Sequence, residues 1–190
     1  MSAQSKLRPF LRDNLDILFI GLNPAKGSSD NEHYFSVNQA FWNQLKESGL
    51  ISAYVDKKNA DEQVFGNNKH NYMNWEFGIT DLVPQIAESD SRKVKPVQEN
   101  VEHLLEEIIQ HEPKVVCLLH MKVFKLIKKY ISNIYKLDKA DTNSSLGCIV
   151  PNLSTYFFKV AFPHGNIITS KTKVLVYKDI KEYLIKLSNR

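Results

Sequence analysis

The sequence predicts an α/β fold: a three-layer sandwich around a central, mainly parallel sheet of four strands, in one domain spanning residues 1–190. Short runs that are apolar throughout alternate along the chain with helical segments, which is typical of a parallel sheet covered by helices on both faces. At 190 residues, with 43% hydrophobic and 24% charged residues, the chain is also long enough to bury such a sheet without disulfides.

The first strand is expected at residues 16–22, an apolar run that ends just before an Asn-Pro pair. Residues 26–32 are polar and are expected to form a loop. A helix is predicted at residues 38–48, because apolar residues recur on one side of it and Gly49 supplies a C-terminal stop.

Residues 54–76 are polar and rich in asparagine, so we expect an irregular surface segment there. A short apolar segment follows at residues 77–83. The clearest helix of the chain then begins at Pro96 and ends before Pro113. Its apolar residues fall on one stripe: Val97, Val101, Leu104, Leu105, Ile108 and Ile109.

The second half of the chain repeats the alternation. Residues 114–119 form another fully apolar strand, and a helix with its apolar side inward is predicted at residues 121–130. Two strands are expected at residues 146–150 and 156–162, and the closing helix at residues 171–187. Sheets of this kind bind ligands at the carboxyl ends of their strands, where functional residues should be sought.

The two cysteines, Cys117 and Cys148, lie in apolar runs. We expect buried, reduced core residues of a cytoplasmic protein rather than ligands of a zinc or iron–sulfur site. Residues 1–8 contain no apolar core, so no secretory signal is expected. The longest apolar runs fall short of the ~20 residues that a membrane span requires.

Charge is distributed unevenly along the chain, although 25 Lys and Arg against 21 Asp and Glu give a formal net charge of only +4. Residues 81–112 carry eight acids and three bases, whereas residues 114–139 carry seven lysines and one acid. Residues 159–190 carry seven bases and two acids. The positive second half can meet a polyanion, and a solvated lysine-rich surface is the alternative explanation.

Several kinds of active site are excluded by the residues present. The six histidines show no metal-ligand spacing and no cluster of acids accompanies them, so no metal site is expected. Gly21 and residues 26–28 lack the glycine spacing of a phosphate loop, and Pro24 removes a backbone donor. No nucleophile elbow or cysteine–histidine signature is present. An enzyme built on this chain should work by positioning and electrostatics.

The segment after the first strand carries the most specific pattern. Phe19-Ile-Gly-Leu-Asn-Pro-Ala, then His33-Tyr-Phe-Ser, then Phe41-Trp-Asn-Gln-Leu resemble motifs of the uracil-DNA glycosylase superfamily, closest to its mismatch-specific uracil/thymine-DNA glycosylase branch. Phe77-Gly-Ile-Thr-Asp-Leu-Val is similar to the Gly-Val-Thr-x-Leu-Val segment of that branch. The resemblance runs in order over most of residues 16–190 and implies the same fold.

The resemblance also implies an activity, the hydrolysis of the N-glycosidic bond of uracil or a related deaminated base in DNA. Such an enzyme extrudes the nucleotide from the base stack into a pocket. By resemblance, Asn23 positions the attacking water, and backbone groups of Gly21 and Leu22 bind the edge of the base. Tyr34 stacks on the base, with Phe35 as the neighbouring candidate. Because an amide is a poor general base, catalysis should be slower than with an aspartate.

A second family motif is a loop after the last strand that enters the minor groove, and Phe162-Pro163-His164-Gly165-Asn166 stands there. By resemblance, His164 contacts a phosphate or the developing charge. Gly165 lets the backbone approach DNA, and Pro163 and Asn166 lie on the same DNA face. The loop is shorter than in the mismatch-specific branch. It lacks a bulky apolar wedge, so base flipping in duplex DNA is expected to be poor.

Lys171 and Lys173, at the start of the closing helix, are candidate contacts to DNA phosphates, and solvated lysines are the alternative. The expected partner is DNA that contains a damaged or mismatched base. No metal, organic cofactor or membrane is expected, and the protein is expected to be a monomer. Two other functions stay open: a non-catalytic nucleic-acid or nucleotide binding protein of the same fold, and hydrolysis of a free nucleoside or nucleotide, which would need no wedge.

Overall fold

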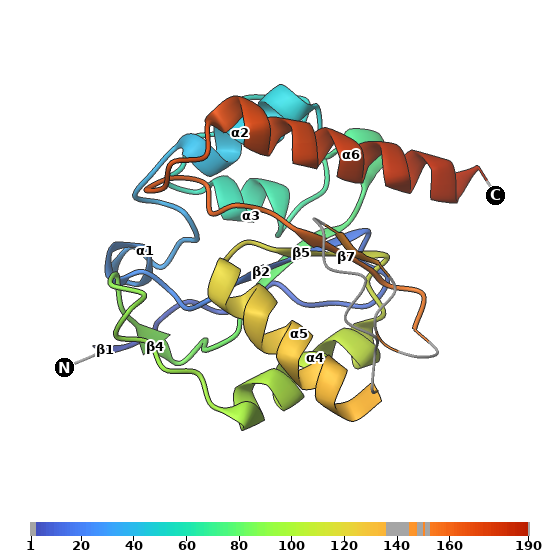
Figure 1. Cartoon of the computed structure of the whole chain (residues 1–190). Helices are drawn as coiled ribbons and strands as arrows, with labels where there is room; N and C mark the ends of the chain where they lie inside the picture. The colour runs from blue at the N-terminus through green and yellow to red at the C-terminus, as the bar shows by residue number, and fades with distance from the viewer. Residues whose placement is uncertain (1–2, 136–144, 148–149, 151–152, 190) are drawn as a thin grey trace.

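The computed structural model describes residues 3–135, 145–147, 150 and 153–189 (Figure 1). Four strands pair in parallel in the order β3-β2-β5-β7, and a fifth, β6, pairs antiparallel with β7 at the edge. In chain order these strands are β2 (Ile17–Gly21), β3 (Phe77–Asp81), β5 (Val115–Leu118), β6 (Ser145–Gly147) and β7 (Tyr156–Lys159). The predicted α/β sandwich with a mainly parallel sheet is confirmed.

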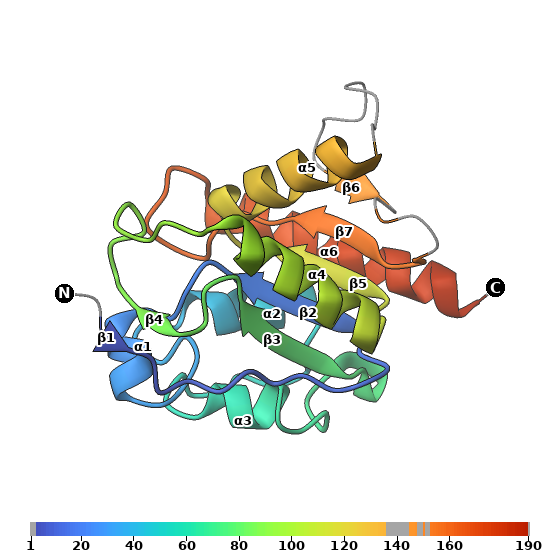
Figure 2. The ribbon, with the colours of Figure 1, turned by 90° about the horizontal axis from the view of Figure 1, so that it is seen from below.

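Helices cover both faces of this sheet (Figures 1 and 2). One face carries α2 (Ala40–Ser48), α3 (Ala60–Val64) and α6 (Ser170–Ser188), and the other carries α4 (Gln98–His111) and α5 (Met121–Tyr135). Successive side chains of β2 therefore enter different cores: Phe19 belongs to the cluster under α2 and α6, and Ile20 to the cluster under α4 and α5.

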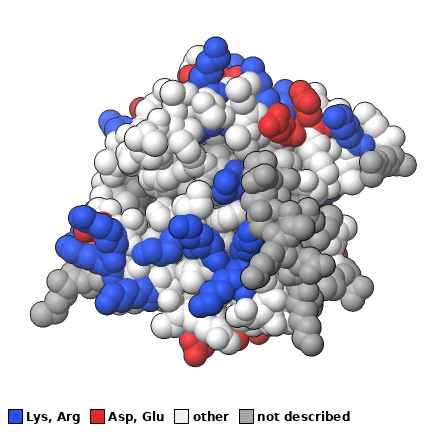
Figure 3. Space-filling view, viewed as in Figure 1, with Lys and Arg blue, Asp and Glu red and all other residues white. Residues whose placement is uncertain are grey.

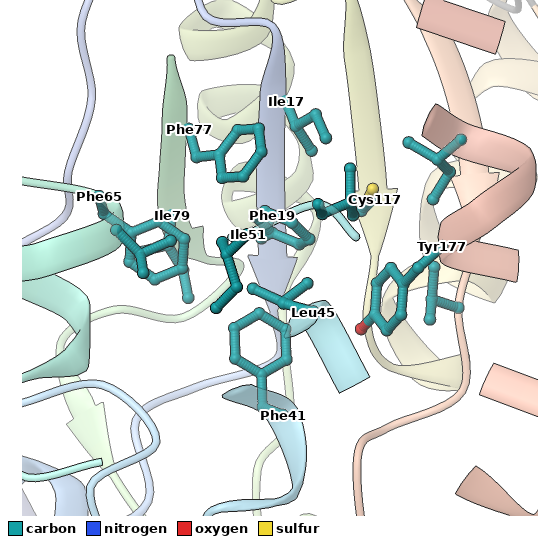
Figure 4. Close-up of a cluster of buried hydrophobic side chains, with 14 of the residues drawn as sticks. Ile17, Phe19, Phe41, Leu45, Ile51, Phe65, Phe77, Ile79, Cys117 and Tyr177 are labelled. Atoms are coloured by element: carbon teal, nitrogen blue, oxygen red, sulfur yellow. The ribbon is translucent and has the colours of Figure 1, made fainter. Parts of the chain in front are cut away.

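The core on the α2 and α6 face is built around one strand residue, Phe19 (Figure 4). Its ring meets Phe41 of α2 edge-on at 5.5 Å between centroids and lies 6.4 Å from Tyr177 of α6. All three side chains are fully buried. Because burial of large aromatic side chains stabilises strongly and fixes geometry, these contacts set where both helices sit on the sheet.

The predicted helices are present: α2, α4 and α6 differ from the prediction by one or two residues at their ends, and α5 continues five residues beyond its predicted end, to Tyr135. The helix α2 ends at Gly49, which has a φ of 73° and supplies the expected left-handed stop. In α4 the buried stripe is narrower than the sequence pattern suggested, because Val97 and Ile109 are 57% and 49% exposed. These two residues lie at the margins of the stripe, where the sheet no longer covers them.

Residues 26–32, expected to form a loop, instead contain a short helix, α1 (Lys26–Asp30). Its Ser28 and Ser29 are buried, and Ser29 Oγ accepts a hydrogen bond from Lys6 N at 3.0 Å. The polar composition therefore reflects hydrogen bonding between segments rather than exposure. A two-residue strand near the start of the chain, β1 (Ala3–Gln4), pairs with β4 (Ile86–Ala87) close by.

The asparagine-rich residues 54–76 are irregular, as expected, but the expectation of a surface segment is wrong. They contain α3 and a 3₁₀ turn, η1 (Tyr72–Asn74), and Val64, Phe65 and Trp75 are buried. Arg12 holds this segment to the strand that follows, by donating to the carbonyl oxygens of Phe65 and Phe77. Most polar residues of the segment lie on its outside, Asp61 and Asn71 are buried and hydrogen-bonded, and the apolar residues complete the core.

Cys117 is buried in β5, as predicted, and burial raises the pKa of its thiol. Cys148 and parts of the strand predicted at 146–150 lie outside the described residues. None of the described helices is long and apolar enough to cross a membrane.

Replacement of the central α2 residue should test this account of the core. Phe41→Ala is expected to lower the free energy of unfolding by about 3–5 kcal/mol, because a fully buried ring is removed and a cavity remains. The exposed Val37→Ala is the control and should change it by less than ~0.5 kcal/mol. Urea denaturation of both variants measures the difference, and similar losses would contradict the assigned core.

Candidate active site

The carboxyl ends of the parallel strands meet at one edge of the sheet, because Gly21 pairs with Asp81 and Ile20 with Leu118. Phe162 follows β7 at this edge, and its ring is the centre of a group of rings, the Phe162 cluster, which includes His120 after β5 and His164. This ring lies 6.2 Å from the ring of His120 and 5.0 Å from that of His164. It also lies 6.3 Å from the ring of Phe35, which comes from the segment after β2.

Asn23 follows β2 at this edge, and its side chain is fixed through its amide nitrogen. Nδ2 donates to the carbonyl oxygens of Pro24 at 2.8 Å, Ile86 at 3.2 Å and Glu88 at 2.8 Å. Three carbonyl acceptors identify this atom as the nitrogen. Oδ1 accepts no hydrogen bond from the described residues, and the side chain is only partly buried. The amide is therefore oriented with its oxygen left for solvent or a ligand.

The structure separates the two aromatic candidates, Tyr34 and Phe35. Tyr34 is 4% exposed and its ring lies 6.4 Å from that of Phe10. Phe35 is half-buried, stacks on Phe41 at 4.2 Å between centroids, and reaches the Phe162 cluster. Phe35 thus reaches Phe162 at the edge of the sheet, whereas the Tyr34 side chain is buried and lines a polar cleft of about 590 Å³.

Asp61 of α3 holds the segment that carries Phe35. Its carboxylate is 1% exposed, accepts from the backbone nitrogen of Tyr34 at 2.7 Å and lies 2.8 Å from Nδ1 of His33. Phe35 itself has a φ of 51°, a left-handed conformation that costs a bulky residue free energy. A buried anchor on the two preceding residues is what maintains such a conformation.

A buried carboxyl, Asp81, ends β3 opposite Gly21. It is 6% exposed, and its Oδ2 has no hydrogen-bond partner among the described residues. A Cβ at position 21 would overlap Asp81 Oδ1, so only glycine lets this side chain lie over β2. Burial raises the pKa of Asp81 to about 7. Asp81 was not among the predicted site residues, although an acid inside the apolar run 77–83 was a usable signal.

The loop after β7 is anchored through the carbonyl oxygen of Pro163. This oxygen accepts from Gln44 Nε2 of α2 at 3.0 Å and from Lys173 Nζ of α6 at 3.1 Å. Lys173 is consequently 3% exposed, and burial lowers its pKa. The predicted phosphate contact of Lys173 is wrong, because the ammonium group lies beneath the loop. Lys171 is exposed at the first turn of α6 and can still reach a phosphate.

The tip of this loop is exposed but internally braced. Asn166 Nδ2 donates to Phe162 O at 2.7 Å, and Asn166 Oδ1 accepts from Ile168 N at 3.1 Å. Gly165 has a φ of 71°, which favours glycine. Ile167 is fully exposed. Pro163–Asn166 itself carries no bulky apolar side chain, and an exposed one, Ile167, lies one residue beyond the stretch that the motif covered.

The model of the uracil DNA glycosylase superfamily matches residues 8–181. The chain belongs to the uracil-DNA glycosylase superfamily. Members of this superfamily are typically DNA glycosylases, hydrolases that release bases from DNA. A comparison with curated proteins finds no match to the chain. The matched family is the superfamily as a whole, without a particular branch.

His120 and His164 lie at this edge of the sheet, and the surroundings of both rings disfavour the charged imidazolium. Burial, assisted by the charge of Lys173, lowers the pKa of His164, and burial together with Lys122 lowers the pKa of His120. His120 Nδ1 accepts a hydrogen bond from Lys122 N at 3.0 Å, so the proton of this imidazole sits on Nε2. Both rings can therefore exchange hydrogen bonds with a ligand without adding a charge.

Gly21 and Leu22, the predicted contacts to the base edge, turn the chain out of β2. Their carbonyl oxygens accept from Leu82 N at 3.0 Å and Val83 N at 2.9 Å. The carbonyl groups are thus engaged in holding the strand ends together. No group of three or more potential metal ligands occurs among the described His, Cys, Asp and Glu residues of this superfamily member.

Asp81→Asn should change how stability depends on pH. The folded pKa of about 7 lies above the usual 3.8, so the unfolded chain loses this proton first as the pH rises. The wild type should therefore lose stability between pH 4 and 7 relative to the variant, by a difference on the order of 4 kcal/mol. Urea unfolding of both proteins across this range measures it. A difference that stays constant with pH would contradict a buried, neutral Asp81.

Proposed function

We propose that this protein is a monofunctional DNA glycosylase that hydrolyses the N-glycosidic bond of uracil, or of a related deaminated base, by direct attack of water. The observation that carries the proposal is the orientation of the Asn23 amide. Its Nδ2 donates to three carbonyl oxygens, while Oδ1 accepts no hydrogen bond from the described residues. The superfamily match supports the class of bond that is broken. The position of Asn23 at the carboxyl edge, where Phe35 and the loop after β7 also lie, supports the site.

A fixed amide oxygen is suited to one task, which is to accept a hydrogen bond from the attacking water and aim its lone pair at C1′. Holding a reactant in this way lowers the entropic cost of attack. Because an amide does not take up the proton, the water attacks after the bond to the base has largely broken. The sugar then carries oxocarbenium character and the base leaves as an anion. When water adds to C1′ it loses a proton to solvent, and the base anion takes up a proton from solvent in turn.

Base extrusion is the second requirement, and two side chains are suited to it. Phe35 supplies a half-buried ring against which an extruded base can stack, a contact worth roughly 1–3 kcal/mol. Ile167 supplies an exposed apolar side chain at the tip of a braced loop, suited to fill the gap left in the stack. In this arrangement Phe35, rather than Tyr34, is the stacking residue.

A binding protein without catalysis is the second candidate function. It is favoured by the fact that the hydrogen bonds of Asn23 all go to neighbouring backbone, which is also what a purely structural turn residue does. The two functions differ in one respect: only the glycosylase releases a free base. The resemblance of the first motif to the mismatch-specific branch makes uracil and thymine mismatches the first substrates to test.

Asn23→Ala should abolish most of the base release. We expect the single-turnover rate on uracil-containing oligonucleotides to fall by at least ~100-fold, because the water is no longer positioned. Asn189→Ala, an exposed asparagine after α6, is the matched control and should keep the wild-type rate. Thermal melting of both variants separates a failure to position the water from a failure to fold.

The wild type itself supplies the stricter test. It should release a base from at least one of four substrates that contain uracil, hypoxanthine, xanthine or mismatched thymine. Absence of release from all four, at high enzyme and low salt, would refute the glycosylase proposal. Salt-sensitive binding that Asn23→Ala leaves unchanged would then support the binding protein.

Ile167→Ala should affect duplex substrates selectively. Removal of a wedge that fills the stack is expected to slow release from duplex DNA by ~10-fold or more, since the apolar side chain that replaces the extruded base is truncated. Release from single-stranded DNA needs no wedge and serves as the internal control. An equal reduction on both substrates, measured as kcat/KM, would show that Ile167 does not act in base flipping.

A further inference from the structure

The helix α5 has one strongly basic face. Its 15 residues include four lysines and no acid. Val123, Phe124 and Ile127 are buried against the sheet, so the lysines occupy the outer side. They are Lys122, Lys125, Lys128 and Lys129.

Most of these lysines have no evident structural task. Lys125, Lys128 and Lys129 form no ion pair or hydrogen bond with any described residue. Three like charges within five residues of one helix repel one another and weaken it. Their combined positive charge is therefore available to an external anion.

Neighbouring segments extend the positive surface on both sides of α5. Lys122 Nζ donates to the carbonyl oxygens of Ser91 at 2.7 Å and Val94 at 2.9 Å, which keeps Lys93 beside the start of the helix. Arg92 lies in the same segment, but its charge is paired with Asp90. On the other side, Lys159 Nζ at the end of β7 lies 5.1 Å from the ring of Phe124. Figure 3 shows Lys and Arg side chains gathered across the face on which Figure 1 shows α5, with few acidic side chains between them.

The basic face begins at the candidate active site and leads away from it. Lys122 follows His120, whose ring contacts the Phe162 cluster. From Lys122 to Lys129 the helix rises by roughly 10 Å. A DNA strand advances about 3.4 Å per nucleotide, so this length corresponds to about three nucleotides.

We propose that the outer face of α5, with Lys125, Lys128 and Lys129, binds the phosphate backbone of the DNA strand that leads away from the extruded nucleotide. The partner is DNA, and the contacts are independent of sequence because they are made to phosphates. The inference rests on the proposed glycosylase function for the direction of the strand. The attraction of this face for phosphates does not depend on that function, because it comes from the four lysines of α5 and the lack of an acid there.

The test is the salt dependence of binding to undamaged DNA. The variant with Lys125→Gln, Lys128→Gln and Lys129→Gln is compared with the wild type on a fluorescent 20-nucleotide duplex, by anisotropy at several salt concentrations. In a plot of log K against log salt, the slope should become less steep by ~0.9 for each phosphate that is no longer neutralised, thus by up to ~2.7. Affinity at low salt should fall with it.

A matched triple variant controls for net charge. Lys69→Gln, Lys178→Gln and Lys186→Gln also remove three exposed lysines, but from other segments of the chain. This variant should keep the slope of the wild type. The control variant should melt with the wild type, and the α5 variant should melt at the same temperature or slightly above it, because removing like charges from one helix relieves their repulsion.

The outcomes separate this inference from the proposed function, because undamaged DNA offers no base to release. Equal slopes for the two triple variants would overturn the α5 proposal even if the wild type releases uracil. A flatter slope for the α5 variant alone supports the proposal even if no base is released. Tighter wild-type binding to RNA than to DNA of the same length and sequence would assign the face to RNA and overturn it.

Discussion

Parallel pairing of β2 with β3 and β5 is the constraint on which the rest of the structure depends. Each of these strands is buried on both faces, so its backbone polar groups can be satisfied only by neighbouring strands. The register Gly21–Asp81 and Ile20–Leu118 then fixes where every strand ends. Asn23, Asp81 and His120 are distant in sequence and reach one edge of the sheet because of this pairing alone.

The sequence was sufficient to predict the architecture, because apolar strands and striped helices are local patterns. It was less informative about single side chains. Tyr34 and Phe35 are adjacent and both aromatic, yet a positive φ at Phe35 sends the two rings in different directions. A lysine is normally a surface residue, and only the packing of α6 under Pro163 shows that Lys173 is buried. Such positions depend on tertiary contacts that no local pattern encodes.

Three polar side chains of the site are buried, although their desolvation costs free energy and apolar packing alone would favour other residues there. Asp61 offsets the cost of desolvation through hydrogen bonds to the segment that carries Phe35. Lys173 is buried with the carbonyl of Pro163 as its described partner. Asp81 keeps one oxygen unpaired among the described residues and is stable chiefly as the neutral acid. Buried groups with few partners destabilise a fold, and they concentrate where a protein positions or binds a ligand.

The base-flipping role proposed for the loop after β7 depends on how firmly the fold holds this loop. The fully exposed side chain of Ile167 makes no buried apolar contact within the protein. Its transfer into another apolar environment therefore breaks no such contact and removes apolar surface from water. What the fold supplies is stiffness. Pro163 is tied to α2 and α6, and Asn166 closes the turn from within. A rigid loop loses little conformational entropy on contact with DNA, so more of the free energy of inserting Ile167 remains for separating the bases. The bracing can thus compensate for the shortness of the loop.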